Sequence, residues 1–433
     1  GDFRAQEVSA AADILPASAL PVVSTATLDN GLRLVHSRDT ATAMVALTAV
    51  YDVGSRDEDP ELTGLAHLFE HMMFGGTEHV PDFDSCLTAA GGENNAFTGN
   101  DFTTYYAAAP AHNAETLFYL ESDRMLCPSL SQATLDVQRS VVIEEFKQQC
   151  LNRPYGDTWH RLRPVIYGKD HPYSWPVIGK EFAHIERVTR QDLLDWHRNY
   201  YMPSNAVVAV TGNIDFDTAL AYARKWFGGI PDRRRTPRAV ADVMPLAEPR
   251  WLEATGRVPS TDITVAYLMD PYGTDGYIAA DAMTDVLASG RASRFYRRLV
   301  ADGDGLFSEA NASIMGSEHQ GVLMLTARLA DTATDASEAA RRLIDEARTV
   351  VTEGVSDYEL QRLKNTQRSM WTMGALDFLA HGQRLAMCAM HGEEQDTMLR
   401  RYRDLSAEAI VGYADRLFGS VAPAVLIYRP DAG

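Results

Sequence analysis

The sequence predicts an α+β fold, a mixed α/β sandwich that occurs twice, in two homologous domains. Two observations predict it. Apolar segments typical of strands, such as Leu32–Tyr51 and Ile263–Met269, alternate along the chain with longer segments of helical periodicity. In addition, a helix-and-strand unit near the middle of the chain recurs near its end.

The recurring unit consists of one helix followed by one apolar strand. In the first copy, the polar-capped helix Arg190–Trp196 leads to the strand Ala206–Val210. In the second copy, a helix around Glu408–Val411 leads to the strand Ala424–Ile427, which begins 218 residues after the first strand. The repetition predicts an internal duplication.

The chain is long enough for two such domains. Its 433 residues exceed the roughly 250–300 residues at which a single core stops growing. Residues 228–237 are rich in turn formers and arginines, which predicts a surface linker whose arginines are solvated. We expect an N-terminal domain over residues 1–228, a linker over residues 229–249 and a homologous C-terminal domain over residues 250–433.

Composition and charge restrict the classes of function. The residues are 45% hydrophobic and 23% charged, as in an ordinary soluble globular protein. No apolar run approaches the about 18 residues of a membrane span. The net charge of −19 argues against nucleic acid as a partner and is compatible with cationic peptides, although a solvated acidic surface explains most of it.

The cysteines and the start of the chain bear on the compartment. Cys86, Cys127, Cys150 and Cys388 show no Cys-x-x-Cys spacing, so we expect free, buried thiols. The chain begins at Gly1, and its first ~25 residues are rich in Ala, Ser and Pro, which fits a processed export product or a trimmed chain. We expect the periplasm, with the cytoplasm as the alternative.

The pentapeptide His67-Leu68-Phe69-Glu70-His71 carries the chemistry. On a helix of about 3.6 residues per turn, two histidines four positions apart share one face and can bind one metal ion. Glu70 points to nearly the same side. Its apolar flanks predict a mostly buried helix that stops at a glycine pair. The alternative is that the histidines fill polar slots in a core.

A catalytic zinc ion normally has a third protein ligand and an open position for water. The best candidates are Glu144 and Glu145, in an amphipathic segment after the helical stretch Glu115–Met125. Adjacent helical residues point roughly 100° apart, so only one of the two carboxylates can face the metal. Periodicity does not choose between them.

At this point the sequence resembles the inverted zincins of the pitrilysin type, a family that includes insulin-degrading enzyme and the mitochondrial processing peptidases. Those proteins carry His-x-x-Glu-His and, downstream, Arg-x-Val-x-x-x-Glu, which Arg139, Val141 and Glu145 match here. The resemblance therefore selects Glu145 as the third ligand. It also implies a two-domain chain that forms half of a peptide-enclosing chamber.

The same resemblance assigns the metal and the base. It implies one Zn²⁺ per chain, held by His67, His71 and Glu145, with Glu70 as the catalytic base. In many members a further glutamate lies seven residues before the third ligand, where this chain has Gln138, which keeps the hydrogen bonding but loses the charge.

Two acidic residues of a neighbouring segment are further candidates. Glu121 and Asp123 could accept hydrogen bonds from a ligand imidazole. Surface ion pairing is the favoured interpretation of both.

The family also has a strand with the signature Gly-x-x-Asn-Ala-x-Thr, matched by residues 92–98. The resemblance implies that a peptide substrate lies along this strand, at Asn95, Ala96 and Phe97. From the residues alone, a short extended segment at a sheet edge can pair its backbone with a peptide. The alternative is an ordinary hairpin strand whose Asn and Gly residues turn the chain.

The second copy lacks the metal motif. Gly276–Leu299 takes the place of the metal helix and contains no histidine pair. In the family's catalytic assemblies this later region often supplies an arginine and, seven residues on, a tyrosine that hold the substrate and the oxyanion. Val300 and Phe307 align with these positions; a shifted register would make Arg297 or Arg298 the relevant residues.

The expected function is a zinc-dependent endopeptidase that hydrolyses short or unfolded peptides. Since the Arg/Tyr pair is missing, we expect a heterodimer with a related subunit that carries this pair and lacks the zinc motif. The alternative is a non-catalytic core or scaffold subunit of a larger complex, against which the intact metal residues argue. A metal-storage protein would need neither Glu70 nor a substrate strand.

Overall fold

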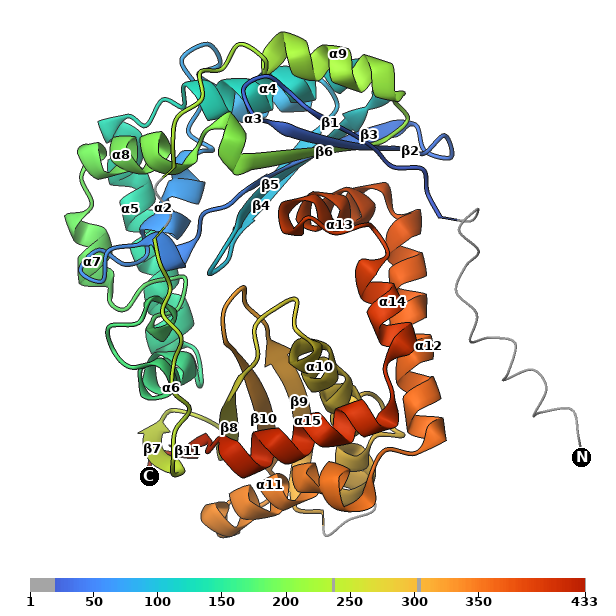
Figure 1. Cartoon of the computed structure of the whole chain (residues 1–433). Helices are drawn as coiled ribbons and strands as arrows, with labels where there is room; N and C mark the ends of the chain where they lie inside the picture. Colours follow the sequence, from blue (N-terminus) through green and yellow to red (C-terminus); the bar gives the residue numbers. More distant parts are fainter. Residues whose placement is uncertain (1–19, 236–237, 302–304, 433) are drawn as a thin grey trace, which may run out of the picture.

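The computed structural model describes residues 20–235, 238–301 and 305–432. Its strands form two sheets, and Figure 1 shows two layers of sheet and helices that face each other and are joined on both sides. The α+β fold with two related halves is confirmed. Within the described ranges, no helix is long and apolar enough to cross a bilayer. Most of the Ala/Ser/Pro-rich start of the chain lies outside the described residues.

The first half contains a six-stranded sheet with the order β1-β2-β6-β3-β5-β4. Strand β6 lies inside the sheet, parallel to β2 and antiparallel to β3, and is buried along its whole length. Its sequence is apolar almost throughout because both faces of the sheet are covered. The strands span Ser24–Thr27 (β1), Arg33–Arg38 (β2), Met44–Tyr51 (β3), Glu93–Thr98 (β4), Thr103–Pro110 (β5) and Ala206–Gly212 (β6).

The second half contains a five-stranded sheet with the order β7-β11-β8-β10-β9. Strand β11 is parallel to β7 and antiparallel to β8, as β6 is to β2 and β3. The two sheets thus share one topology, which confirms the duplication. The strands span Arg250–Gly256 (β7), Asp262–Met269 (β8), Phe307–Met315 (β9), Gly321–Leu329 (β10) and Ala424–Pro430 (β11).

The helices follow the same duplication. In both halves of the described chain, five α-helices lie between the hairpin, β4–β5 or β9–β10, and the strand β6 or β11. Those of the first half are α2 (Leu65–Met72), α3 (Phe83–Ala89), α4 (Ala114–Leu126), α5 (Gln132–Phe146), α6 (Thr158–Tyr167), α7 (Phe182–Arg187), α8 (Arg190–Tyr200) and α9 (Phe216–Trp226). Those of the second half are α10 (Asp275–Ala288), α11 (Ala336–Glu353), α12 (Asp357–Leu376), α13 (Phe378–His391), α14 (Thr397–Asp404) and α15 (Ala407–Ser420). In the first half α2 and α3 lie between β3 and the hairpin β4–β5, and in the second half α10 lies between β8 and the hairpin β9–β10.

The counterpart of the metal helix differs from the expected segment Gly276–Leu299. Helix α10 ends at Ala288, and a separate π-helix, η8, spans Tyr296–Ala301. The helix is interrupted at Ser289, Gly290 and the turn that follows them. Gly290 has a φ of 75°, which a residue with a side chain rarely adopts.

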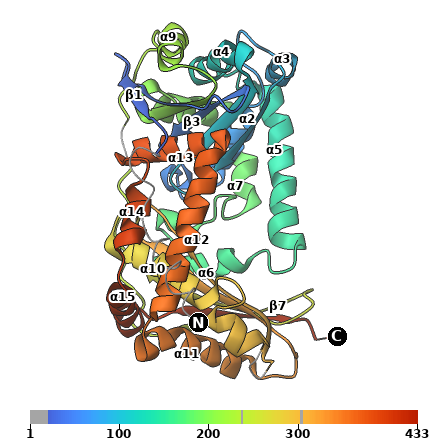
Figure 2. The same ribbon diagram turned by 90° about the vertical axis from the view of Figure 1, so that its right-hand side faces the viewer.

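Each half lends one helix to the sheet of the other half. Helix α13 packs on β2, β3 and β6 of the first sheet, and α6 packs on β8 and β11 of the second. The contacts are apolar: Leu385 and Ala386 join a cluster with Val50 and Val207, while Leu162 joins residues of the second sheet. Figures 1 and 2 show that α12 runs from the lower layer up to α13.

The linker region is not merely a solvated spacer. Arg233 donates hydrogen bonds to the carbonyl oxygens of His197 and Arg198 in the last turn of α8 and to that of Tyr201, 3.1 Å away. Arg235 pairs with the carboxylates of Asp52 and Asp57. The expectation that the arginines are solvated was therefore wrong for Arg233 and Arg235, whereas Arg234 is exposed. The domain limits at residues 228 and 250 stay a prediction. Helix α6 precedes these limits in the chain but packs on the second sheet, and α13 follows them but packs on the first sheet.

The thiols are free, but three of them are more accessible than expected. Only Cys150 is buried, and Cys86, Cys127 and Cys388 are half-buried. The expectation of burial was therefore wrong for these three residues: Cys86 and Cys388 lie on α3 and α13, and Cys127 directly follows α4.

The exchange of α13 makes a prediction about Gly382, where the helix approaches β6. A Cβ atom at Gly382 would lie 2.8 Å from Thr211 Oγ1, whereas a Cβ atom at Gly412 of α15 would meet nothing within 4 Å. We expect Gly382→Ala to lower the free energy of unfolding by about 1–3 kcal/mol, despite the better helix propensity of alanine. Gly412→Ala, the matched control, should raise it by roughly 0.5–1 kcal/mol. Urea denaturation of both variants checks this, and equal stabilisation would contradict close packing of α13.

Candidate metal centre

Helix α2 carries the pentapeptide, and its amphipathic sequence orients it. Leu65, Leu68, Phe69 and Met72 are buried in the core of the first half. The helix begins at Gly64, whose φ is 87° and whose Cβ position lies 2.9 Å from a carbonyl oxygen, so that only glycine fits without strain. The apolar face thus turns the two histidines and Glu70 away from the core.

A buried carboxyl group fixes the start of α2. Glu58 is fully buried, and its two oxygens accept hydrogen bonds from Ala66 N (2.8 Å) and from Trp175 Nε1 (2.9 Å). A carboxyl group at this position satisfies a helix N–H that has no partner within the helix. Burial raises the pKa of Glu58 to about 8, against the hydrogen bonds from the backbone, which lower it.

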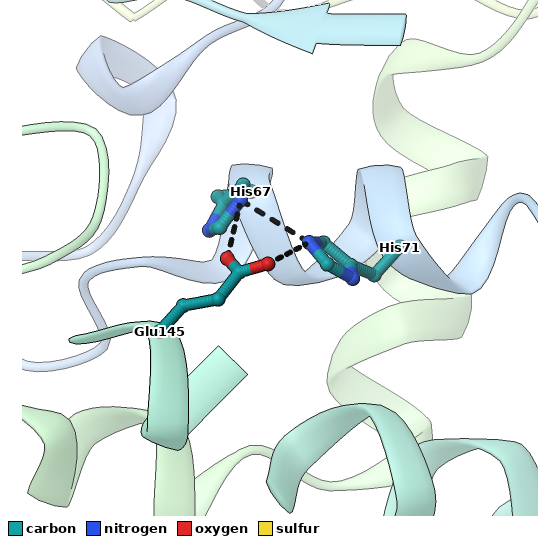
Figure 3. Close-up of side chains that lie close together, drawn as sticks. All are labelled: His67, His71 and Glu145. Carbon is teal, nitrogen blue, oxygen red and sulfur yellow. Dashed lines mark hydrogen bonds and ion pairs between the residues drawn. The ribbon is translucent and has the colours of Figure 1, made fainter. Parts of the chain in front are cut away.

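The structure brings together the three predicted ligands (Figure 3). His67 Nε2 and His71 Nε2 lie 3.3 Å apart. The two oxygens of Glu145 lie 3.4 Å from His67 Nε2 and 3.5 Å from His71 Nε2. Tetrahedral zinc with bonds of about 2.0–2.2 Å holds its ligand atoms roughly 3.3–3.5 Å apart, so that nitrogen and oxygen atoms in this arrangement fit Zn²⁺.

The packing of α5 against α2 decides between the two adjacent glutamates. Glu145 is half-buried and faces the histidines, whereas Glu144 is exposed. Glu145 lies in the last turn of α5, directly before the π-helix η5 (Lys147–Asn152). Arg139, on the same helix, donates a hydrogen bond to the carbonyl oxygen of Val188 and so ties α5 to the segment before α8.

The electrostatics of the site suit metal binding and proton transfer. Burial, with a smaller effect from His71, lowers the pKa of His67 to about 4, so its imidazole is neutral at pH 7, as a ligand must be. Burial also raises the pKa of Glu70, and a hydrogen bond from the Thr98 hydroxyl opposes this rise. Glu70 is therefore a carboxylate whose proton affinity is higher than in water.

Gln138 and Glu121 were both candidates for supporting the ligands, and the structure places only Gln138 in contact with one of them. His71 Nδ1 lies 3.1 Å from Gln138 Oε1, so the amide oxygen accepts from the ring and leaves Nε2 free for a metal. Glu121 instead accepts a hydrogen bond from Arg124, 2.6 Å away, and both residues are buried. The expected surface ion pair of Glu121 is thus an interior pair. Within the described part of the chain, His67 Nδ1 has no hydrogen-bond partner.

The predicted substrate strand is β4, at the edge of the first sheet and beside α2. Among the described strands it pairs only with β5, so the backbone groups of its other edge have no partner strand there. Asn95 and Phe97 are exposed, the latter by 51%, and Ala96 is half-buried. Such an edge can accept an extended peptide as an additional strand.

Sequence reasoning missed two groups that act on the site. Thr98, the last residue of the strand signature, donates a hydrogen bond from its hydroxyl to Glu70, and the sequence pattern assigned it no role. Glu58 supports α2 from nine residues before His67 and belongs to no spacing pattern. A signal existed only for Thr98, because a hydroxyl at the end of a strand beside the metal helix can reach the base.

The chain is similar to known peptidases. Residues 33–155 match the family model described as insulinase (peptidase family M16), and residues 187–367 match the model described as the peptidase M16 inactive domain. The chain belongs to the M16 peptidase family, and the recognition of the pitrilysin type is confirmed.

Three relatives illustrate the similarity. The zinc protease PqqE of Helicobacter pylori is 28% identical over 321 residues, which cover 72% of this chain and 70% of PqqE. The crystal structure of a protease from Helicobacter pylori superposes with a TM-score of 0.86 at 23% identity, over 95% of this chain and all of that one. The periplasmic protease PqqL from Escherichia coli gives a TM-score of 0.78 at 20% identity, over 96% of this chain but 48% of PqqL.

The contact between Gln138 and His71 makes a prediction about metal affinity. Gln138→Leu removes the acceptor that orients the His71 ring, so we expect the affinity for Zn²⁺ to fall about 10- to 100-fold. Gln148→Leu, at an exposed position of η5, is the matched control and should leave affinity unchanged. Competition for zinc with a chromophoric chelator measures both. Equal affinities of the two variants would show that Gln138 does not support the ligand.

The raised pKa of Glu58 predicts a pH dependence of stability. In the unfolded chain Glu58 loses its proton near its ordinary pKa of 4.5, whereas the folded chain holds the proton to about pH 8. Between these values the unfolded chain binds fewer protons, so the free energy of unfolding falls as pH rises, by about 1.4 kcal/mol per unit of pKa difference. Glu58→Gln should lack this contribution. Urea denaturation of both proteins from about pH 5 to pH 9 tests it, and a constant difference in stability would contradict it.

Proposed function

We propose that this chain is a zinc-dependent endopeptidase subunit that hydrolyses short or unfolded peptides. The observation that carries the proposal is the convergence of His67, His71 and Glu145 beside Glu70, a carboxylate with a raised pKa. The names of its relatives, zinc proteases, support the same chemistry. One zinc ion per chain, at these three ligands, is part of the proposal.

Bound Zn²⁺ would supply Lewis acidity, which lowers the pKa of water and polarises a peptide carbonyl. The chain's own residues would do the rest. Glu70 would accept a proton from the attacking water at Oε1 or Oε2 and later deliver it to the leaving amine. The hydroxyl of Thr98 holds the Glu70 side chain in place, and Gln138 holds the tautomer of His71.

The substrate would bind as an extended strand along β4. Its backbone would pair with the free edge near Asn95 and Ala96, and Phe97 would contact its side chains. Because main-chain hydrogen bonds carry most of this binding, the site would accept many sequences but only extended, and therefore short or unfolded, peptides.

The second half offers no donor for the oxyanion at the positions that the family uses. Phe307 is 1% exposed and belongs to the core of the second half, and Val300 packs against the same core. Arg297 donates to the Ala292 carbonyl oxygen, and Arg298 pairs with Glu346 and a neighbouring carboxylate. A catalytic site that lacks one oxyanion donor loses about 2.7–4 kcal/mol of transition-state stabilisation.

We therefore propose that a related M16 chain, which carries the Arg/Tyr pair and lacks the zinc motif, completes the site in a heterodimer. The relation to PqqL supports this, because the chain spans about half of that protein's length. Two such chains facing each other would enclose a chamber. The proposed compartment is the periplasm, which the description of PqqL as periplasmic supports; the cytoplasm is the alternative.

A second candidate function is that of a non-catalytic core or scaffold subunit. It is favoured by the match of residues 187–367 to a model described as inactive. In that case the whole chain, like the inactive domain that its second half matches, would have no catalytic role. The metal residues would then bind zinc without hydrolysis.

The test is hydrolysis of a quenched-fluorescent library of mixed peptides, with zinc quantified in the same sample. The chain is assayed alone and with a related chain that carries the Arg/Tyr pair and lacks the zinc motif. We expect about one zinc per chain at the three ligands and hydrolysis only in the mixture. Glu70→Gln should keep the zinc and reduce the rate at least 100-fold, to an extent typical of a lost general base (about 10²–10⁴).

Glu144→Gln is the matched control, since Glu144 is exposed and adjacent to the ligand Glu145. It should retain both zinc and activity. Full activity of the chain alone would remove the heterodimer but keep the peptidase. Zinc without hydrolysis in any mixture would favour the scaffold.

A further inference from the structure

A second group of possible metal ligands lies outside the site described above. Within the described residues, His79, Asp123 and Cys127 are the other set of at least three such side chains whose ligand atoms all lie within 4.8 Å of one another. Cys127 Sγ lies 3.4 Å from Asp123 Oδ1 and 3.6 Å from His79 Nδ1. These separations agree with those of sulfur, oxygen and nitrogen ligands on one zinc ion.

Two elements place these three side chains. Asp123 and Cys127 lie four residues apart at the end of α4, on one side of the helix. His79 comes from the loop that follows α2, and the loop is held against α4 by a hydrogen bond from Glu78 N to the Cys127 carbonyl oxygen, 3.0 Å long. Gly76, at the start of this loop, has a φ of 89° and a Cβ position 2.3 Å from a carbonyl oxygen, so the turn requires glycine.

The cluster combines a buried acidic side chain, that of Asp123, with an exposed imidazole, that of His79. Asp123 is 5% exposed, and the ion pair that the structure shows for it is with His79, whose Nδ1 lies 2.7 Å away. The hydroxyl of Thr77 donates to its second oxygen, at 2.5 Å. Arg124, the next residue along the helix, pairs with Glu121 instead. A buried carboxylate is stable only with a positive partner, which His79 provides when protonated and a dication would provide more strongly.

The thiol is the group that a metal would change most. Burial and the neighbouring Asp123 raise the pKa of Cys127 to about 12, so without a metal the thiol is protonated and donates weakly to Asp123. The side chain of His79 is 60% exposed, which leaves its ring free to turn and open the 2.7 Å contact to the roughly 3.3 Å expected around zinc.

We propose that His79, Asp123 and Cys127 form a second metal site that binds Zn²⁺ through nitrogen, oxygen and sulfur. The solvent-facing side of His79 leaves a fourth position for water. On binding, the Cys127 thiol proton and the proton shared by His79 Nδ1 and Asp123 pass to solvent, and no other bond changes. Imidazole and thiolate together select zinc over magnesium or calcium.

Such a site would be structural. It would link the loop after α2 to the end of α4, and so fix the C-terminal end of the helix that carries His67 and His71. The alternative is a His79–Asp123 ion pair beside a free thiol, with no metal. Neither depends on peptidase activity.

Substitution with Co²⁺ tests the proposal, because a thiolate ligand gives a charge-transfer band in the near ultraviolet that His/Glu sites lack. The full chain, freed of metal with a chelator, is dialysed against excess Co²⁺ and then against metal-free buffer, and zinc content is measured in parallel samples loaded with Zn²⁺. We expect about two metal ions per chain and a thiolate band. Cys127→Ser and His79→Gln should each lose the band and keep about one ion, at His67, His71 and Glu145.

The matched control is Cys86→Ser, a half-buried free thiol in the same half of the chain, which should keep the band. Glu145→Gln should lose the metal of the first site and also keep the band, so the two sites are counted separately. One ion per chain without a thiolate band would overturn the proposal, and so would a band that persists in Cys127→Ser. Circular dichroism of each variant confirms that it has folded.

Discussion

The packing of α5 against α2 is the contact on which the site depends. Two histidines on one helix bring only two ligands, and the third must arrive from a segment 74 residues later in the chain. The first core holds both helices on the sheet, with buried side chains of each among its members. Because the core fixes the distance between the helices, the carboxylate of Glu145 reaches both Nε2 atoms without any contact of its own to the backbone.

The two halves are held together by the helices α6 and α13, each of which packs on the sheet of the other half. A single sheet with helices on one face would leave its other face to solvent, and each half instead covers the other's sheet with one helix, α6 or α13. Opening the two halves would therefore expose apolar surface on both sheets. The apolar contacts of α6 and α13 therefore oppose separation of the two halves.

The sequence predicted the parts of the structure that follow from local pattern. Strand β11 and helix α15 lie where the duplication predicted them, because period and burial are encoded residue by residue. Whether Glu144 or Glu145 faces the histidines depends on the rotation of α5 in the tertiary structure, and only the resemblance to the family chose between them. Arg235 looked solvated, since nothing local reveals Asp52, which lies 183 residues earlier in the chain.

The second half has the fold of the first half but not its metal motif. Its sheet has the topology of the first, but its chemistry has been replaced by packing: Phe307 begins β9 inside the core, where a tyrosine hydroxyl would need a partner. Phe307→Tyr would thus place a hydroxyl in an apolar core, whereas Val300 is half-buried. The physical constraint on this half is stability. The proposed partner chain would supply such donors without this cost to the core of the second half.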